Sequence, residues 1–176
     1  MGISPGIPHV DPTAGSPLLR VGARVTGTTP GRWLARRVAP RIDPTLLRIS
    51  RGRVSSALVT PELLLQHRGS KTGRLRTTPL TYFTDHGRVI VIASNYGGSR
   101  HPAWYYNVLA NPHVTISAGG YTAPFTGIEV TGTERDRLWA LAVGFIPSYA
   151  DYEQRAGNRR IPVLAFTEET DDPTNR

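Results

Sequence analysis

The chain has 176 residues, of which 39% are apolar, and its formal net charge is +8. This length is typical of one domain with a sizeable core, whereas the absence of Cys excludes disulfide scaffolds, thiolate metal sites and thiol nucleophiles. No apolar run approaches the roughly 20 residues of a membrane-spanning helix, and the N-terminus lacks the pattern of a signal peptide, so we expect a cytoplasmic protein.

Basic residues gather in the first part of the chain. Residues 1–53 carry nine Arg against two Asp, and positions 1–30 are rich in Gly, Pro, Ser and Thr. We interpret 1–53 as a basic N-terminal arm, disordered or loosely packed at its start, and 54–176 as the folded domain. Residues 32–39 predict a short basic amphipathic helix. It would either contact the inner face of an anionic membrane or cap the domain.

From about residue 58 the sequence consists of short apolar segments between turn residues, which is typical of a small sheet. Strands are predicted at 63–67, 77–84, 88–93, 114–117, 122–130 and 161–167. One helix should begin at Pro102 and end before Asn111-Pro112. A second should open at Thr133, as in a weak capping box, and give way to a loop after Phe145. The order predicts an α+β fold, an antiparallel barrel with flanking helices.

The densest group of functional residue types lies between the first two predicted strands. Residues 67–78 combine two glycines, several hydroxyls and the cations Arg68, Lys71, Arg74 and Arg76. Glycine turns expose backbone N–H groups, and the cations add charged donors, so a phosphate or a row of carboxylates would fit. The stretch is no P-loop, because a strand follows it instead of a helix. The alternative is a solvated basic hairpin that binds nothing.

A second group follows the third predicted strand. Residues 93–98 end that strand in small residues and glycines, which would let a flat ring approach the backbone closely. The aromatic residues of 102–107 would then form a wall for the ring. Aromatic residues at helical spacing are also typical of a core, so both interpretations stay open here. We interpret His101 as a helix cap or a surface side chain.

Other catalytic and metal-binding patterns are missing. The five His residues show no i, i+4 pair and no Asp or Glu at ligand spacing, so we predict no metal site. Ser94 does not lie in a G-x-S-x-G elbow, and the acids cluster in the polar last third of the chain. By elimination, we expect the protein to take its reactivity from a cofactor.

A series of short motifs runs through residues 57–166. In chain order they are Gly69-Ser70-Lys71-Thr72-Gly73 with Arg76 and Pro79-Leu80, Val91-Ile92-Ala93-Ser94, Pro102-Ala103-Trp104-Tyr105-Tyr106-Asn107 with Ala110-Asn111-Pro112, Pro147-Ser148-Tyr149-Ala150-Asp151-Tyr152, and Arg160-Ile161-Pro162-Val163. In this order and spacing they resemble the deazaflavin-dependent nitroreductase family of actinobacteria.

The resemblance implies a split β-barrel oxidoreductase that uses reduced coenzyme F420, a deazaflavin with a phosphate and an oligoglutamate tail, to reduce quinones or nitroaromatic compounds. By position, the phosphate and tail would be held by Ser70, Lys71, Thr72, Arg76, Thr77, Thr78, Pro79, Leu80 and Thr81. The ring would be held by Ala93, Ser94, Asn95, Ala103, Trp104, Tyr105, Tyr106 and Asn107, with Tyr149 over it. Ser94, Tyr149 and Tyr152 are the candidates to stabilise or protonate the acceptor.

Two positions depart from the family pattern. Ser70 stands where relatives often carry Arg, which weakens tail binding unless Arg68 and Arg74 compensate. Ile146 stands where some nitroreducing relatives carry Tyr, so quinones are the favoured acceptors. Two alternatives stay open: a barrel that uses FMN, and a basic barrel that binds single-stranded nucleic acid. Because most aromatic residues lie away from the Arg-rich arm, we expect small-molecule partners and no nucleic acid.

Overall fold

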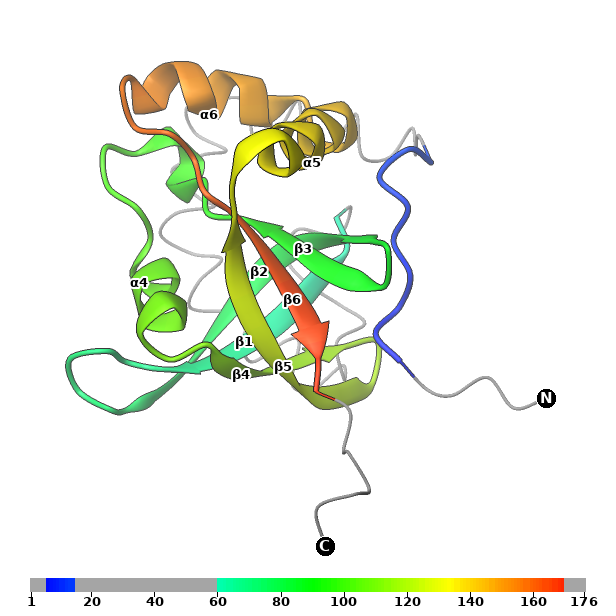
Figure 1. The fold of residues 1–176 in the computed structure, drawn as a ribbon, viewed down its shortest axis with the longest axis vertical. Coiled ribbons are helices and arrows are strands. Elements are labelled where there is room, and N and C mark those ends of the chain that lie inside the picture. The colour runs from blue at the N-terminus through cyan, green and yellow to red at the C-terminus, as the bar shows by residue number, and fades with distance from the viewer. Residues whose placement is uncertain (1–5, 15–59, 170–176) are drawn as a thin grey trace, which may run out of the picture.

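The computed structural model describes residues 6–14 and 60–169. Within these ranges, six strands close an antiparallel barrel in the order β1-β2-β3-β6-β5-β4 (Figure 1). Their bounds are β1 (Glu62–Arg68), β2 (Leu75–Asp85), β3 (Arg88–Ile92), β4 (His113–Ala118), β5 (Tyr121–Val130) and β6 (Val163–Glu168). The predicted α+β barrel is therefore confirmed.

Four helical segments accompany the barrel in the described ranges. A short 3-10 helix, η1 (Asn95–Gly97), and α4 (Ala103–Ala110) connect β3 to β4. Helices α5 (Gly132–Phe145) and α6 (Ser148–Ala156) lie between β5 and β6 in the chain and cover one end of the barrel (Figure 1). None of these helices is long and apolar enough to cross a membrane.

The strands follow the alternation that a barrel requires. In β1, Leu63, Leu65 and His67 are all buried, and they lie two residues apart, so their side chains point to the same inner face. Leu65 lies opposite Thr78 of β2, and His67 lies opposite Arg76. One group of core residues fills the barrel, and a second group packs α5 and α6 against its end.

The chain differs from the sequence-based prediction in its helices. Residues 148–156 form helix α6 where a loop was expected. Helix α5 begins at Gly132 after an N-cap at Thr131, so Thr133 lies inside the helix and forms no capping box. The N-cap of α4 is Pro102, and no side chain caps that helix, so His101 is not its cap.

Residues 6–14 lie against the barrel, although loose packing was expected at the start of the arm. The Thr84 N–H donates to the Val10 carbonyl at 2.9 Å, and the Val10 N–H donates to Thr84 Oγ1 at 3.0 Å. Tyr82 Oη donates to the Pro8 carbonyl at 3.1 Å. This segment is therefore held against β2 by one bond between main-chain groups and by bonds from its main chain to the side chains of Tyr82 and Thr84. The predicted amphipathic helix at 32–39 lies outside the described residues.

Candidate functional site

The β1–β2 hairpin ends in a loop that its own backbone holds. The Gly69 N–H donates to the Arg74 carbonyl at 2.9 Å, and the Gly73 N–H donates to the Gly69 carbonyl at 2.7 Å. Gly73 has a φ of +64°, which residues with a Cβ rarely adopt. The loop and the strand ends beside it present four exposed cations, named here the basic hairpin: Arg68, Lys71, Arg74 and Arg76.

The basic hairpin has no acidic partner in the described part of the chain. The ion pairs found there join other residues, among them Asp85, Glu134 and Asp136, to Arg side chains of β3 and α5 and to Arg160. Four neighbouring cations without carboxylates repel one another and attract a polyanion. The hairpin therefore has the charge and the donors of an anion site.

A buried hydrogen-bond chain connects the basic hairpin to α4. The Ser70 N–H donates to Asn107 Oδ1 at 2.9 Å, and Asn107 Nδ2 lies 3.2 Å from His67 Nδ1. His67 Nε2 lies 3.0 Å from Thr78 Oγ1. Burial, with a smaller contribution from the Arg76 charge, lowers the pKa of His67, so this imidazole is neutral near pH 7. Three predicted cofactor-binding residues thus share one network with a histidine that the prediction left out.

Helix α4 divides the predicted ring-binding residues between two faces. Trp104 and Tyr105 are buried in the barrel core, and Tyr105 Oη donates to Glu129 Oε2 at 2.7 Å. Ala103 and Tyr106 face outward, and Tyr106 is 50% exposed. The ring centroids of Tyr105 and Tyr106 lie 5.2 Å apart. An aromatic ligand on this helix would therefore meet Ala103 and Tyr106 first, while Trp104 and Tyr105 support the helix from below.

The turn after β3 has an unusual backbone. Asn95, Tyr96 and Gly97 have φ values of 48°, 53° and 74°, and residues with a Cβ adopt such values at a cost of about 1–3 kcal/mol each. A Cβ on Gly97 would lie 2.7 Å from the Tyr152 carbonyl oxygen, so the turn packs directly against α6. Backbone strain of this kind is concentrated at ligand sites.

Arg159 holds this turn from the connection between α6 and β6. Its guanidinium donates to the carbonyl oxygens of Ser94 at 2.7 Å, Gly98 at 2.8 Å and Ala93 at 3.5 Å. It also donates to His101 Nδ1 at 3.0 Å. Burial and the Arg159 charge lower the pKa of His101, so the ring stays neutral and accepts this bond. Sequence reasoning missed Arg159, because its partners lie 58 to 66 positions away in the chain.

Helix α6 places two candidate tyrosines in an aromatic cluster. The ring centroids of Tyr149 and Tyr152 lie 5.9 Å apart; Trp139 lies 6.0 Å from Tyr149, and Tyr96 lies 5.9 Å from Tyr152. Burial raises the pKa of Tyr149 above its ordinary value of about 10, and the hydroxyl carries its proton near pH 7. The hydroxyl of Ser148 is also buried and has no hydrogen-bond partner among the described residues.

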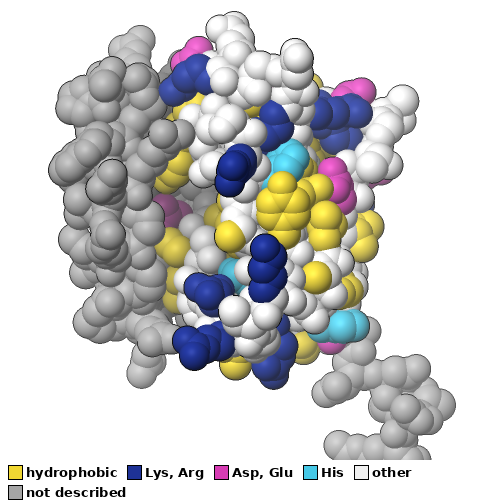
Figure 2. All heavy atoms as spheres, turned by 90° about the vertical axis from the view of Figure 1, so that its left-hand side faces the viewer, with side chains coloured by type: hydrophobic (Ala, Val, Ile, Leu, Met, Phe, Trp, Pro, Cys, Tyr) yellow, Lys and Arg dark blue, Asp and Glu magenta, His cyan; other side chains and the backbone are white. Residues whose placement is uncertain are grey.

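These features follow one another along one side of the molecule. The β1–β2 hairpin, α4 and η1 lie on the left of Figure 1, and α6 lies above η1. Figure 2 shows this side, where a hydrophobic patch separates cations at the lower end from cations above. Tyr106 and Leu109 are the large exposed hydrophobic residues of α4. The surface therefore suits an elongated ligand with an aromatic part and an anionic part.

The structure places the remaining predicted residues at the hairpin, around the turn and along β2. Lys71, Thr72 and Arg76 are exposed at the hairpin, Asn95 is exposed in the turn, and Ser94 is half-buried beside it. Ala93 is buried at the end of β3. Half-buried residues of β2 continue inward from the hairpin: Thr77, Thr78, Pro79, Leu80 and Thr81.

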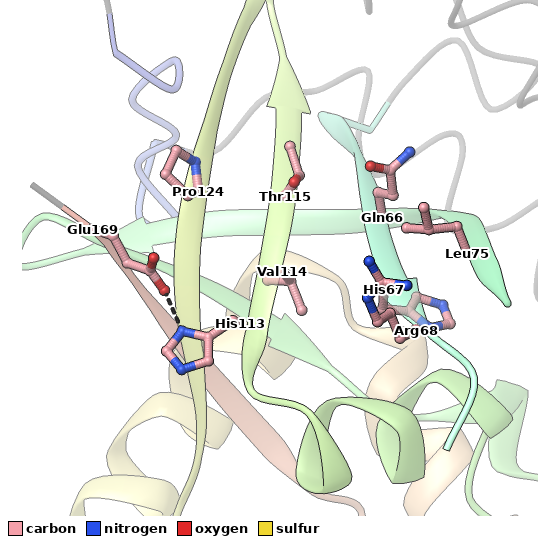
Figure 3. A pocket seen from close by; sticks show the side chains of 9 residues that line it. All are labelled: Gln66, His67, Arg68, Leu75, His113, Val114, Thr115, Pro124 and Glu169. Carbon is pink, nitrogen blue, oxygen red and sulfur yellow. Dashed lines mark hydrogen bonds and ion pairs between the residues drawn. The ribbon is translucent and has the colours of Figure 1, made fainter. Parts of the chain in front are cut away.

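A cavity of about 290 Å³ opens beside β1, β4 and β5. Figure 3 shows its lining residues, Gln66, His67, Arg68, Leu75, His113, Val114, Thr115, Pro124 and Glu169. His113 Nδ1 lies 2.7 Å from Glu169 Oε1 at its edge. Arg68 of the basic hairpin and His67 of the buried hydrogen-bond chain line this cavity, whereas the residues that the resemblance assigns to the cofactor do not. Across residues 6–14 and 60–169, no three His, Asp or Glu side chains group closely enough to hold a metal ion.

Comparisons with known proteins place this geometry in context. A family model described as F420H(2)-dependent quinone reductase matches residues 39–168. A protein of Mycobacterium tuberculosis (strain ATCC 25618 / H37Rv) named F420H(2)-dependent quinone reductase is 35% identical over 77% of this chain and 96% of its own length.

Two solved structures also resemble this chain. One, described as an F420-H2 dependent reductase, has a TM-score of 0.56 and 38% identity, and the match covers 60% of this chain and 93% of that one. The other, described as a domain-swapped dimer, has a TM-score of 0.57 and 32% identity over 78% of this chain and 99% of that one. At 38% and 32% identity, both structures resemble this chain in sequence as well as in fold.

Proposed function

Since this chain belongs to the F420H(2)-dependent quinone reductase family, we propose that it transfers a hydride from reduced coenzyme F420 to a quinone. The family match supports this reductase over the two alternatives, an FMN-type barrel and a nucleic-acid-binding barrel. The observation that carries the proposal to particular residues is the basic hairpin, whose cations have no acidic partner in the described ranges.

The donor set of the basic hairpin fits the anionic part of the coenzyme. Phosphate and glutamate carboxylates accept several charged hydrogen bonds, and Lys71 and Arg76 supply donors of that kind from an exposed position. Arg68 and Arg74 flank them and offset the missing Arg at Ser70. We assign the phosphate and tail to this hairpin and to the adjoining residues of β2.

The turn at η1 and the outer face of α4 fit the flat part of the coenzyme. Ser94 precedes the strained turn and Asn95 begins it, and the small side chain of Ala103 lies on the same exposed face of α4 as the ring of Tyr106. Arg159 fixes the carbonyl groups of this turn, so its shape exists before a ligand arrives. A preformed turn reduces the entropy lost on binding.

When bound, reduced F420 supplies the hydride for the reaction. The residues of this chain have to orient the acceptor and support the charge that develops on its oxygen. The Tyr149 hydroxyl carries its proton near pH 7, so it can donate a hydrogen bond toward that oxygen. Ser94 and Tyr152 remain the other candidates. Ser94 precedes the turn and its carbonyl accepts from Arg159, and the Tyr152 ring of α6 packs against the ring of Tyr96.

Quinones are the proposed acceptors over nitroaromatic compounds. Ile146 ends α5 and packs against the core that holds Tyr149, and it has no hydroxyl to offer a nitro group. We expect kcat/KM to be higher for a quinone than for a bicyclic nitroimidazole. Equal values for the two acceptors would contradict this preference.

We also propose that residues 1–53 contact an anionic membrane surface, because their nine Arg face only two Asp. Co-sedimentation with vesicles that contain an anionic phospholipid should retain the full chain. Vesicles of neutral phospholipid serve as the control. Equal retention by both would argue against an electrostatic contact.

A titration with purified coenzymes tests the proposed function. Fluorescence quenching should show micromolar or tighter binding of F420 and weaker binding of FMN, and an oligonucleotide should not compete. Reduced F420 should then be oxidised only when a quinone is present. Equal affinity for F420 and FMN would overturn the cofactor assignment, and binding without turnover would overturn the reductase assignment.

A further inference from the structure

The hydrogen-bond chain from Ser70 to Thr78 has a defined direction. A backbone N–H only donates, so Asn107 Oδ1 must accept from Ser70, and the Asn107 amide group must turn its Nδ2 toward His67. Nδ1 of His67 then has to accept, which requires that it carries no proton. The neutral ring therefore holds its proton on Nε2 and donates it to Thr78 Oγ1.

With the bonds in this direction, the hydroxyl proton of Thr78 has no acceptor within the chain of bonds. Thr78 Oγ1 accepts from His67, so its own O–H is free to donate, and no acceptor for it is found in the described part of the chain. Thr78 is half-buried beside the basic hairpin. The chain of bonds thus ends in a hydroxyl donor two residues along β2 from Arg76 of the basic hairpin, and an anionic group accepts hydrogen bonds from both kinds of donor.

We propose that His67 is a positioning residue for the anion site: in its neutral form it holds the Ser70 turn through Asn107 and aims the Thr78 hydroxyl at the anionic part of the cofactor. This inference rests on the proposed function. The proposed role of His67 is indirect: the buried ring acts through Asn107 and Thr78 and does not contact the cofactor. The bonds join β1, β2 and α4, so the His67 side chain links three elements of the site.

Protonation of His67 would reverse this arrangement. A proton on Nδ1 would face the Asn107 amide donor, so the amide would have to turn over, and its Oδ1 would leave the Ser70 N–H. Arg76 on β2 and burial disfavour this protonation, whereas the Arg68 carbonyl favours it. His113 and Glu169 face the same cavity from β4 and from the residue after β6, and α4 contributes no Asp, Glu, Lys or Arg.

The sign of the expected pH effect separates positioning from simple charge. Because the His67 pKa lies below its ordinary value of about 6.5, the site should be intact at pH 7.5 and should weaken as the pH falls toward 5. A new positive charge near an anion would by itself strengthen binding instead. We call the hydrogen-bond chain from Ser70 through Asn107 and His67 to Thr78 the relay. A fall in cofactor affinity at low pH therefore supports the relay, and a rise or no change overturns it.

Two matched variants divide the relay. His67→Asn keeps an acceptor for Asn107 and loses the donor to Thr78, whereas His67→Gln keeps that donor and loses the acceptor. Each should raise the Kd of F420 roughly three- to tenfold at pH 7.5, as expected for one lost hydrogen bond. Each should also abolish the loss of affinity between pH 7.5 and pH 5. His113→Gln removes a histidine outside the relay and should follow the wild type.

A double-mutant cycle tests the link to the ligand. Thr78→Val should weaken F420 binding in the wild-type background. The same substitution should cost much less in His67→Asn, where the hydroxyl is no longer aimed. Additive effects in the two backgrounds would show that His67 does not act through Thr78, and would overturn that half of the relay.

Measurements on the ligand-free protein keep the inference distinct from the cofactor assignment. Nitrogen NMR should show the His67 proton on Nε2 at pH 7.5, and amide exchange corrected for pH should show Ser70 protected. Protection should persist in His67→Asn and disappear in His67→Gln. If F420 fails to bind the wild type, the proposed function falls while these readouts still decide the relay. If F420 binds but Ser70 is unprotected, the relay alone falls.

Discussion

Lys71 is the single lysine of the chain, and it lies exposed in the basic hairpin. If it donates to the phosphate or tail, Lys71→Ala should raise the Kd of F420 roughly tenfold, the lower end for a charge-assisted bond because water screens an exposed charge. The effect should shrink in high salt. Fluorescence titration at two salt concentrations measures it, with Arg160→Gln, which alters an exposed cation paired with Asp136, as control.

The same lysine permits a direct test of contact. An amine-reactive reagent should label Lys71 and the N-terminus, and saturating F420 should protect Lys71 while the terminal amine stays reactive. Mass spectrometry of the labelled peptides compares the two positions within one molecule. Labelling of Lys71 that F420 leaves unchanged would remove the basic hairpin from the cofactor site.

Tyr149 allows a separation of binding from chemistry. Tyr149→Phe removes only the hydroxyl, and the ring contacts with Trp139 and Tyr152 remain. If the hydroxyl donates to the acceptor in the transition state, kcat should fall roughly tenfold or more while the Kd of F420 stays the same. Single-turnover oxidation of reduced F420 gives both values. A change in Kd with unaltered kcat would make Tyr149 part of the cofactor site.

Among the elements, the turn at η1 depends on a single residue from a distant segment. Arg159→Lys keeps the charge but replaces the planar guanidinium, which reaches Ser94, Gly98 and His101, by one point donor. We expect a loss of about 2 kcal/mol in the free energy of unfolding, the contribution of a charged group that bonds several acceptors. F420 affinity should fall as well. Denaturant unfolding measures the first effect. Arg160→Gln breaks an exposed ion pair, so it should lower stability much less than Arg159→Lys and leave F420 affinity unchanged.

Two glycines distinguish backbone strain from crowding in this turn. Gly97 and Gly87 have nearly equal φ values of 74° and 75°. A Cβ at Gly97 would clash with the Tyr152 carbonyl, whereas a Cβ at Gly87 would lie in open space. Gly87→Ala should therefore cost about 1 kcal/mol, and Gly97→Ala about 3 kcal/mol or more. Thermal unfolding compares the two. Equal losses would show that α6 does not press on the turn.

Local patterns account for what the sequence could predict about these elements. All six strands were predicted because period-two burial and turn residues are local signals, as the spacing of Leu63 and Leu65 in β1 illustrates. Helix α6 was missed because it is short and polar, although its buried Tyr149, Tyr152 and Ala156 keep a helical spacing that could have indicated it. Pro147 before it was interpreted as part of a loop.

Local sequence patterns could not predict the residues that support the candidate site from behind. His67 lies 40 positions from Asn107, and Arg159 lies 65 from Ser94. Barrel closure alone brings such pairs together. The family motifs named the residues on the surface of the site, but they did not name those that hold it from behind. Periodicity in β1 predicts that His67 points inward, which is the one signal that could have raised it as a candidate.

At the scale of the whole molecule, acidic side chains form ion pairs among the described residues, whereas the cations of the basic hairpin do not. Acids and Arg side chains form ion pairs that connect α5 to the β2–β3 turn and to residue 160. Asp85, whose side chain is only 9% exposed, accepts two hydrogen bonds from Arg137 at 2.9 and 2.7 Å. Asp85, Glu134 and Asp136 are thus paired within the described fold, and the basic hairpin is left for an anion from outside.

This division predicts how stability depends on pH. Hydrogen bonds from Arg137 lower the pKa of Asp85, bonds from Arg88 lower that of Glu134, and bonds from Arg135 and Arg160 lower that of Asp136. A carboxyl group whose pKa is lower in the folded state stabilises the fold above its unfolded pKa, near 4. It loses this contribution as the pH falls through the folded value. His67 and His101 also have lowered pKa values in the fold, so the unfolded chain binds protons below about pH 6.5 that the folded rings resist. The melting temperature should therefore decline gently from pH 7 to 5 and fall steeply from pH 4 to 3.

Asp85→Asn tests which pair carries most of this effect. The variant leaves Arg137 and Arg88 without their shared buried partner, so it should lose about 1–2 kcal/mol at pH 7 and show a shallower fall below pH 4. Asp151→Asn changes an exposed carboxylate that forms no ion pair in the described ranges, and it should melt like the wild type at each pH. Calorimetry of the three proteins between pH 7 and pH 3 provides the comparison. If Asp85→Asn loses stability equally at every pH, the pair acts through packing, and its titration does not set the acid limit of the fold.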